Sequence, residues 1–185
     1  MLRRCLHPLL LASLAALALV GAQGVAQADN SNVAYHFLLG IDGLIGPDEA
    51  GAPNGLIFVI TGEGDFSIHP KVTGSGGGDY SIEDPDGNVL SEGTWTVTDF
   101  ISFVSYGSFA APAPPSFEGG QALFRIHLTP SSEGPGADGV LKVTCLGGSP
   151  PPGKDEGVQL ALEGSPNFNL NFGGEEGGQT LFIRQ

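Results

Sequence analysis

The sequence predicts an all-β protein, and three observations lead to this fold class. Apolar and polar residues alternate over several segments, as they do in strands with one buried face. After residue 28, no stretch of ten or more residues has the spacing of an amphipathic helix. The 30 glycines and 14 prolines separate short apolar segments and follow no collagen-like period. We therefore expect a single domain of about nine or ten short antiparallel strands, either curved and barrel-like or arranged as a two-sheet sandwich.

The first 28 residues have the features of a cleaved export signal. Arg3 and Arg4 give a positive start, and the apolar run Leu9–Val20 is shorter than the roughly 20 residues that cross a bilayer. Ala26-Gln27-Ala28 has the small-x-small form that signal peptidase recognises. We expect cleavage after Ala28 and a single β domain over residues 29–185, with no retained membrane anchor. The expected location is extracellular, or periplasmic if the host is Gram-negative.

The charge of residues 29–185 excludes some classes of partner. The segment keeps all 20 acidic residues and five of the 7 basic ones, so its net charge is about −15. Such a charge repels phosphate backbones and anionic lipid surfaces, which excludes nucleic-acid binding. Cys145 is the one cysteine left, so no internal disulfide can form, and its alternation with Leu141 and Val143 predicts a buried thiol.

The first half of the domain contains several strand-like segments. Val33–Ile41 alternates, Leu56–Thr61 is continuously apolar, and Asp65–Val72 alternates again. The glycine run Gly74–Gly78 is interpreted as a flexible connection. Asp84–Asn88 combines proline and glycine in a pattern that predicts the turn of a β-hairpin.

The second half begins with Gly93–Tyr106, which is rich in β-branched and aromatic residues. Its alternation changes phase near Asp99-Phe100, which predicts a β-bulge or a corner. Ala110–Ser116 contains three prolines and is expected to be a surface connection. Further strands are expected at Gln121–Thr129, Val140–Leu146, Val158–Leu162, Asn167–Phe172 and Gln179–Ile183.

No motif in the sequence predicts a metal, a cofactor or a catalytic residue. Asp84–Asn88 with Glu92 offers oxygens for calcium, but its spacing departs from the EF-hand pattern and favours a plain turn. His36, His69 and His127 fall on three different expected strands and lack the spacing of a zinc site. The sequence therefore favours a protein without catalytic activity and leaves an enzyme open.

Four residues are candidates for ligand binding: Trp95, Phe103, Arg125 and His127. Gly93-Thr94-Trp95 resembles the Gly-x-Trp signature of lipocalins but lies in the middle of the chain, where a core tryptophan in a sandwich is favoured. Arg125 and His127 share one face of an expected strand. They could hold an anionic group if that face lines a cavity, whereas in an ordinary sandwich they point to water.

A wider arrangement of segments resembles a group of known proteins. These segments are Val72–Gly78, the following hairpin, Ser91–Trp95, Phe100–Gly107, Leu141–Cys145 and Glu156–Val158. In this arrangement the chain is similar to small secreted β-rich proteins of bacteria and filamentous fungi that have no established activity. The resemblance implies an exported β protein and assigns no catalytic residue.

Three functions remain compatible with the sequence. Export, acidity and strand content favour a binding or surface-interaction module, with no ligand or partner assigned. The alternative is a lipocalin-like barrel that carries a small apolar ligand, with the four candidate residues near it. A hydrolase with paired carboxylates would require two acidic side chains about 5 to 10 Å apart in an aromatic groove, and the sequence ranks no pair above another.

Overall fold

The computed structural model describes residues 32–40, 47–164, 167–171 and 180–185, and Ser31–Gln185 form one compact unit. Every regular element in these ranges is a strand, which confirms the all-β fold class. The strands are β1 (Val33–Leu39), β2 (Asp48–Gly51), β3 (Ile57–His69), β4 (Lys71–Glu83), β5 (Val89–Ser108), β6 (Phe117–Pro130), β7 (Ala137–Cys145), β8 (Gly157–Leu162), β9 (Leu170–Asn171) and β10 (Thr180–Arg184). Within the described ranges, no helix has the length and apolar character needed to span a membrane. The expected signal, residues 1–28, lies outside the described residues.

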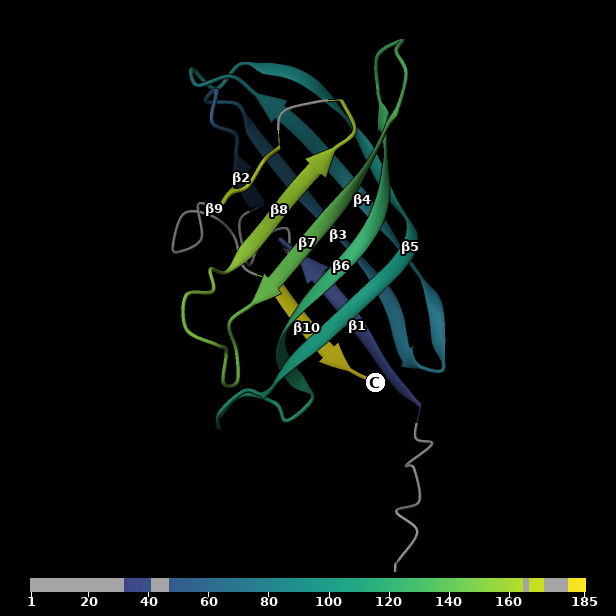
Figure 1. Ribbon diagram of the computed structural model, residues 1–185, viewed down its shortest axis with the longest axis vertical. Helices are drawn as coiled ribbons and strands as arrows, with labels where there is room; N and C mark the ends of the chain where they lie inside the picture. Colours follow the sequence, from purple (N-terminus) through teal and green to yellow (C-terminus); the bar gives the residue numbers. More distant parts are fainter. Residues whose placement is uncertain (1–31, 41–46, 165–166, 172–179) are drawn as a thin grey trace, which may run out of the picture. The chain divides into compact units, whose positions relative to one another are not determined.

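All ten strands belong to one antiparallel sheet whose pairings form a ring. β1 pairs with both β10 and β3, and β10 pairs with β6, so β3, β4, β5, β6, β10 and β1 close on one another. On the other side, β7 and β8 extend from β6, while β2 and β9 extend from β3. Figure 1 shows β6, β7 and β8 crossing in front of β2, β3 and β4. The curved form therefore matches the structure, and a pair of separate sheets does not.

The inner face of this sheet carries an aromatic core. Alternate residues of β1 and β6 point inward as expected: Tyr35, Phe37 and Leu39 are buried on β1, as are Ala122, Phe124, Ile126 and Leu128 on β6. Phe66 stacks on Phe100 with ring centroids 4.7 Å apart, and Phe37 lies 4.8 Å from Phe124. Because aromatic rings bury large apolar areas, these contacts between distant strands stabilise the closed arrangement.

The interpretation of Gly74–Gly78 as a flexible connection is wrong, because the run lies inside β4. Its Gly76 pairs with Gly64 of β3, and the ring of Phe37 covers both glycines. A Cβ added at Gly64 would lie 2.6 Å from the Cα of Gly76 and 2.7 Å from the Phe37 ring. Glycine is therefore needed here for close approach of backbone and ring.

Several strand boundaries also differ from expectation. The expected strand Asp65–Val72 is the end of β3 and the start of β4, joined by a tight turn in which Ile68 pairs with Lys71. The strand β2 was not predicted. The strands were predicted to be short, and this is wrong for β3 to β6, which have 13 to 20 residues. Register shifts, including one between Val97 and Asp99 where a bulge was predicted, let these long strands bend.

The segment near residue 170 does not continue one alternating strand. Phe168 is buried and bridges Leu160 of β8, but Leu170 is 49% exposed and pairs with Gly51 of β2. Because the pairing partner changes between these two residues, they do not share a buried face. Ile41, Phe172 and Gln179, at the ends of other expected strands, lie outside the described residues.

Two predicted connections are confirmed. Asp84–Asn88 joins β4 to β5, with Gly87 at φ 81° and the Asp84 carboxylate accepting from the amides of Asp86 and Asn88. The Asn88 side chain, followed by those amides, lowers the pKa of Asp84. Ala110–Ser116 connects β5 to β6 outside the strands. The Asp84 carboxylate is thus engaged within its own turn.

Candidate functional site

The structure places Trp95 and Phe103 on the inner face of the sheet. Trp95 is 1% exposed, and its Nε1 donates a hydrogen bond to the Thr61 carbonyl oxygen at 2.9 Å. Phe103 contacts Tyr35, with ring centroids 4.6 Å apart, and Phe182 at 5.0 Å. Trp95 is therefore a core residue, as the sequence favoured. Among the described residues, neither ring lines the two surface hollows of β5 to β8.

Arg125 and His127 lie on the outer face of β6, as their alternation predicted. The Nδ1 of His127 lies 2.7 Å from Asp138 Oδ1. On its other side the ring packs against Gly136, where an added Cβ would lie 2.4 Å from Nε2. His127 is therefore held by its neighbours on β7 and the preceding loop. The structure separates the four candidates into an inner and an outer pair.

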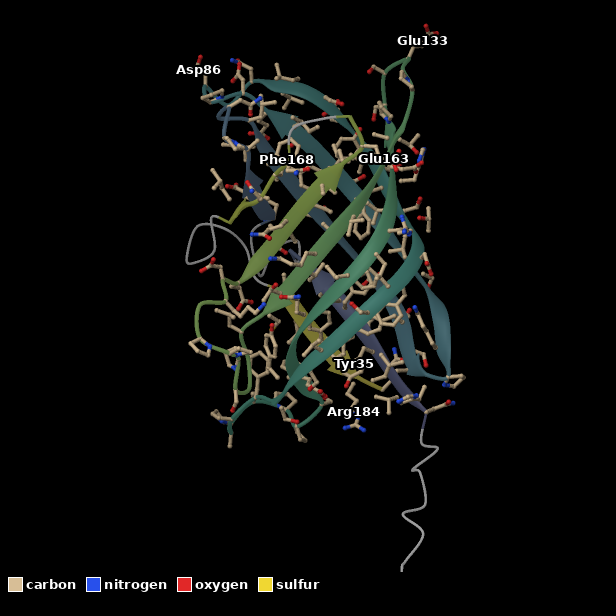
Figure 2. All side chains as sticks on the ribbon, in the orientation of Figure 1. Tyr35, Asp86, Glu133, Glu163, Phe168 and Arg184 are labelled. Atoms are coloured by element: carbon tan, nitrogen blue, oxygen red, sulfur yellow. The ribbon has the colours of Figure 1, made fainter. Side chains whose placement is uncertain are left out.

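Arg125 lines a hollow of about 510 Å³ on the outer face of β5 to β8. Register brings its parts together, since Asp99 pairs with Arg125, Arg125 with Val140, and Val140 with Ala161. The lining residues are Thr98, Arg125, Ile126, Asp138, Gly139, Val140, Ala161, Leu162 and Glu163. Figure 2 labels Glu163 near the end of β8. The hollow thus combines one guanidinium, two carboxylates and an apolar floor.

A second hollow of about 190 Å³ adjoins the first and shares Val140 and Ala161 with it. Its other lining residues are Lys142, Gln159, Leu160, Asn167, Phe168 and Asn169. Burial, and then the charge of Lys154, lower the pKa of Lys142. Three of the five basic residues after residue 28 therefore lie on or beside this outer face. We call the two hollows together the Arg125 face.

Two acidic side chains are buried within the described ranges, and the first is Glu118 at the start of β6. The Tyr35 hydroxyl donates to Glu118 Oε1 at 3.0 Å, and the Ser105 hydroxyl donates to the same oxygen. Burial, and then the charge of Glu118, raise the pKa of Tyr35 to about 12, while Arg184 opposes them. Figure 2 shows Tyr35 and Arg184 near the C-terminal end of β10. Glu118 therefore has donors that offset its burial.

The second buried acid is Asp48, the first residue of β2, which is 0% exposed. Neither carboxylate oxygen meets hydrogen-bond geometry with any described group, although the Gly40 backbone N–H is close enough to oppose the rise in the pKa of Asp48. Burial, and then the charge of Glu156, raise the pKa of Asp48 to about 8. Burial likewise raises the pKa of Glu156, which accepts the Leu146 amide at 2.7 Å.

Cys145 lies beside this acidic pair and is buried, as the sequence predicted. Burial is the largest cause that raises the pKa of its thiol to about 11, and Glu156 adds to the effect. A thiol with such a pKa stays protonated near neutral pH and is a poor nucleophile. Cys145 is therefore a core residue.

Sequence reasoning missed both buried carboxylates. Asp48 follows a proline and precedes another acid, so nothing in the local pattern distinguishes it from a loop residue. Glu118 stands before two glycines, and no alternation reaches it. Tyr35, the partner of Glu118, is 83 residues away in the sequence. Glu156, whose charge acts on Asp48, lies just before β8. Only pairing between distant strands reveals these contacts.

Comparison of the chain with family models, curated proteins and solved structures gives no significant match. The resemblance to small secreted β-rich proteins therefore stays a prediction.

Proposed function

We propose that this protein is an exported binding module whose recognition surface is the Arg125 face, and that its ligand is a neutral oligosaccharide. The observation that carries this proposal is the hollow of about 510 Å³ around Arg125. Its guanidinium offers five N–H donors in a fixed plane and makes no ion pair with any described residue. An exposed donor group of this kind is available to a ligand.

The polar groups of the Arg125 face suit sugar hydroxyls, which both donate and accept hydrogen bonds. Arg125 supplies donors, Asp138 and Glu163 supply acceptors, and the amides of Asn167 and Asn169 supply both. Between them, Val140 and Ala161 give an apolar floor for the C–H face of a sugar ring. The two hollows meet at these residues, so a ligand longer than one ring would span both.

Within the larger hollow, charge disfavours an anionic ligand. Asp138 and Glu163 flank Arg125, so a carboxylate or phosphate at the guanidinium would lie near two like charges. The acidic chain as a whole repels polyanions. A neutral ligand avoids both penalties.

The other two hypotheses receive less support from the described residues. The rings around Trp95 and Phe103 pack against one another on the inner face, where a carrier would hold its apolar ligand. A hydrolase would need paired carboxylates in an aromatic groove. Asp138 and Glu163 share the larger hollow, but its described lining contains no aromatic residue. Asp138 is also hydrogen-bonded to His127.

A binding experiment tests the proposal. The purified protein is titrated by calorimetry and amide NMR with cellopentaose, chitopentaose, laminaripentaose and maltopentaose, and with trigalacturonate as an anionic contrast. At least one neutral sugar should bind and shift the amides of β6 to β8. Because hydrogen bonds to a charged group contribute about 1.5 to 3 kcal/mol, Arg125→Gln should weaken binding by about 10- to 100-fold.

Arg184→Gln is the matched control, because it removes an exposed arginine from β10, away from the Arg125 face. It should leave binding unchanged. Equal binding by wild type and Arg125→Gln would contradict the proposed surface. Binding of trigalacturonate alone, or of no sugar in the panel, would contradict the proposed ligand class.

A further inference from the structure

The buried carboxylate of Asp48 has no adequate compensation among the described residues. Both of its oxygens are buried and make no hydrogen bond of good geometry with a described group, although the Gly40 backbone N–H lies nearby. A buried ionised carboxylate normally requires paired charge, hydrogen-bond donors or a metal, because removing it from water without them costs several kcal/mol. This is unlike Glu118, whose burial is matched by two hydroxyl donors.

A second carboxylate increases this imbalance. Glu156 immediately precedes β8, which lies against β2, and its charge raises the pKa of Asp48. Burial raises the pKa of Glu156, and the amides of Leu146 and Thr180, with the Thr180 hydroxyl, oppose this rise, so Glu156 has more hydrogen-bond donors than Asp48. Two like charges share a buried junction of β2, β8 and β10.

Thr180 places a third oxygen beside Glu156. Thr180 Oγ1 lies 2.6 Å from the Thr144 carbonyl oxygen and 3.3 Å from Glu156 Oε1. A hydroxyl has one hydrogen, and the nearer carbonyl accepts it. The Thr180 hydroxyl therefore points its hydrogen mainly at the carbonyl, contacts Glu156 Oε1 as the longer of two acceptors, and keeps lone pairs beside that carboxylate. Oxygens that share one Ca²⁺ at about 2.4 Å are separated by a similar distance, roughly 3 Å, when adjacent.

Gly157 brings the backbone beside Glu156 close to Asp48. Gly157 follows Glu156 with φ 103°, and a Cβ added there would meet a single described atom, Asp48 Oδ1, at 3.8 Å. The backbone next to Glu156 therefore passes close to one Asp48 oxygen.

We propose that the carboxylates of Asp48 and Glu156 bind a hard divalent cation of the Ca²⁺ class, with the hydroxyl oxygen of Thr180 as a third ligand. Two carboxylates match the charge of one divalent ion, and oxygen donors are those that Ca²⁺ prefers. Backbone carbonyls and water would complete the six to eight ligands that Ca²⁺ takes. All three proposed donors are oxygens, whereas zinc prefers nitrogen and sulfur ligands. The ion would join β2, β8 and β10, three strands that are distant in sequence.

Thermal melting near neutral pH tests this site with the metal alone as the probe. In millimolar Ca²⁺ the midpoint for the wild type should rise by roughly 5 to 10 °C over its value in EDTA, as expected for an ion present at about 100 times its Kd. Calorimetry should give one Ca²⁺ per chain. Asp48→Asn should abolish both the shift and the binding, and Glu156→Gln, which removes the other carboxylate, should do the same.

Asp86→Asn is the control, because it removes an acid from the exposed Asp84–Asn88 turn. It should keep the full shift, and loss of the shift in this variant would place the ion in the turn and overturn the proposal. NaCl at equal ionic strength should not reproduce the shift, since a shift of equal size would indicate diffuse screening of an acidic chain. An unchanged wild-type midpoint in Ca²⁺ would overturn the proposal and leave a proton shared by the two carboxylates.

Discussion

Glu118 and Asp48 are both acidic side chains buried inside one sheet, but their surroundings differ. Glu118 is 5% exposed and accepts from the hydroxyls of Tyr35 and Ser105. Asp48 is 0% exposed, lacks such donors among the described residues and faces the charge of Glu156. Burial alone therefore does not decide what a carboxylate does for stability. The donors around it decide whether its ionised form is tolerated.

This comparison predicts that matched amide substitutions have opposite effects, and the larger effect belongs to Asp48. In EDTA, Asp48→Asn should stabilise the fold by on the order of 4 kcal/mol near pH 7, since each pKa unit corresponds to about 1.4 kcal/mol. The amide removes a group that must otherwise be protonated or carry an uncompensated charge. Chemical denaturation of both proteins measures the difference, and a destabilised variant would contradict the assignment of Asp48 as an uncompensated acid.

The sign of the pH dependence follows from the same shift. The pKa of Asp48 rises from 3.8 to about 8, so the folded protein holds a proton that the unfolded chain releases. Stability from this proton is complete below about pH 4 and is lost as the pH rises toward about 8. Glu156 and Cys145 face the same junction and are unchanged in the variant. The gain from Asp48→Asn should therefore shrink toward pH 4, and a gain independent of pH would indicate a packing effect.

Glu118→Gln should destabilise the fold by about 2 kcal/mol, because the Tyr35 and Ser105 hydroxyls would donate to a neutral amide oxygen instead of a carboxylate, which is the stronger acceptor. Urea denaturation near pH 7 measures this change. The variant matches Asp48→Asn in chemistry, so it controls for the substitution itself. A stabilised Glu118→Gln would show that the two carboxylates do not differ as described.

Tyr35→Phe should have the smallest effect, a loss of about 1 kcal/mol, because Ser105 still donates to Glu118. A double-mutant cycle with Glu118→Gln measures the coupling between the two side chains. The structure predicts that the two losses are not additive, since both changes remove the same hydrogen bond. Additive losses would indicate that the bond is not formed.

The parts of the fold that the sequence predicted depend on local patterns. The alternation in β6 identified its inner face, and the proline and glycine of Asp84–Asn88 identified the hairpin turn. Both features are settled within about ten residues of chain, where side-chain direction follows the two-residue period.

The remaining features depend on distant partners. The glycines of β4 could not be placed, because the reason for them is the ring of Phe37 on β1. The strand β2 has only four residues, and its place is set by pairing with β3 and β9. Of the candidate site, Arg125 was predicted to face outward, but the hollow around it arises from the register of four strands. Asp48 carries no local signal at all.

The ring of pairings has a consequence for how the chain folds. Its closing contact joins β1 to β10, the first and last strands of the unit, with Phe37 opposite Phe182. The two strands of this contact are far apart in the sequence, so bringing them together costs much chain entropy. We therefore expect the contact to form late and folding to be slow. During synthesis the ring cannot close until the final residues have left the ribosome. A chain that ends before Thr180 would leave β1 without this partner and expose the core, so such truncated chains should aggregate.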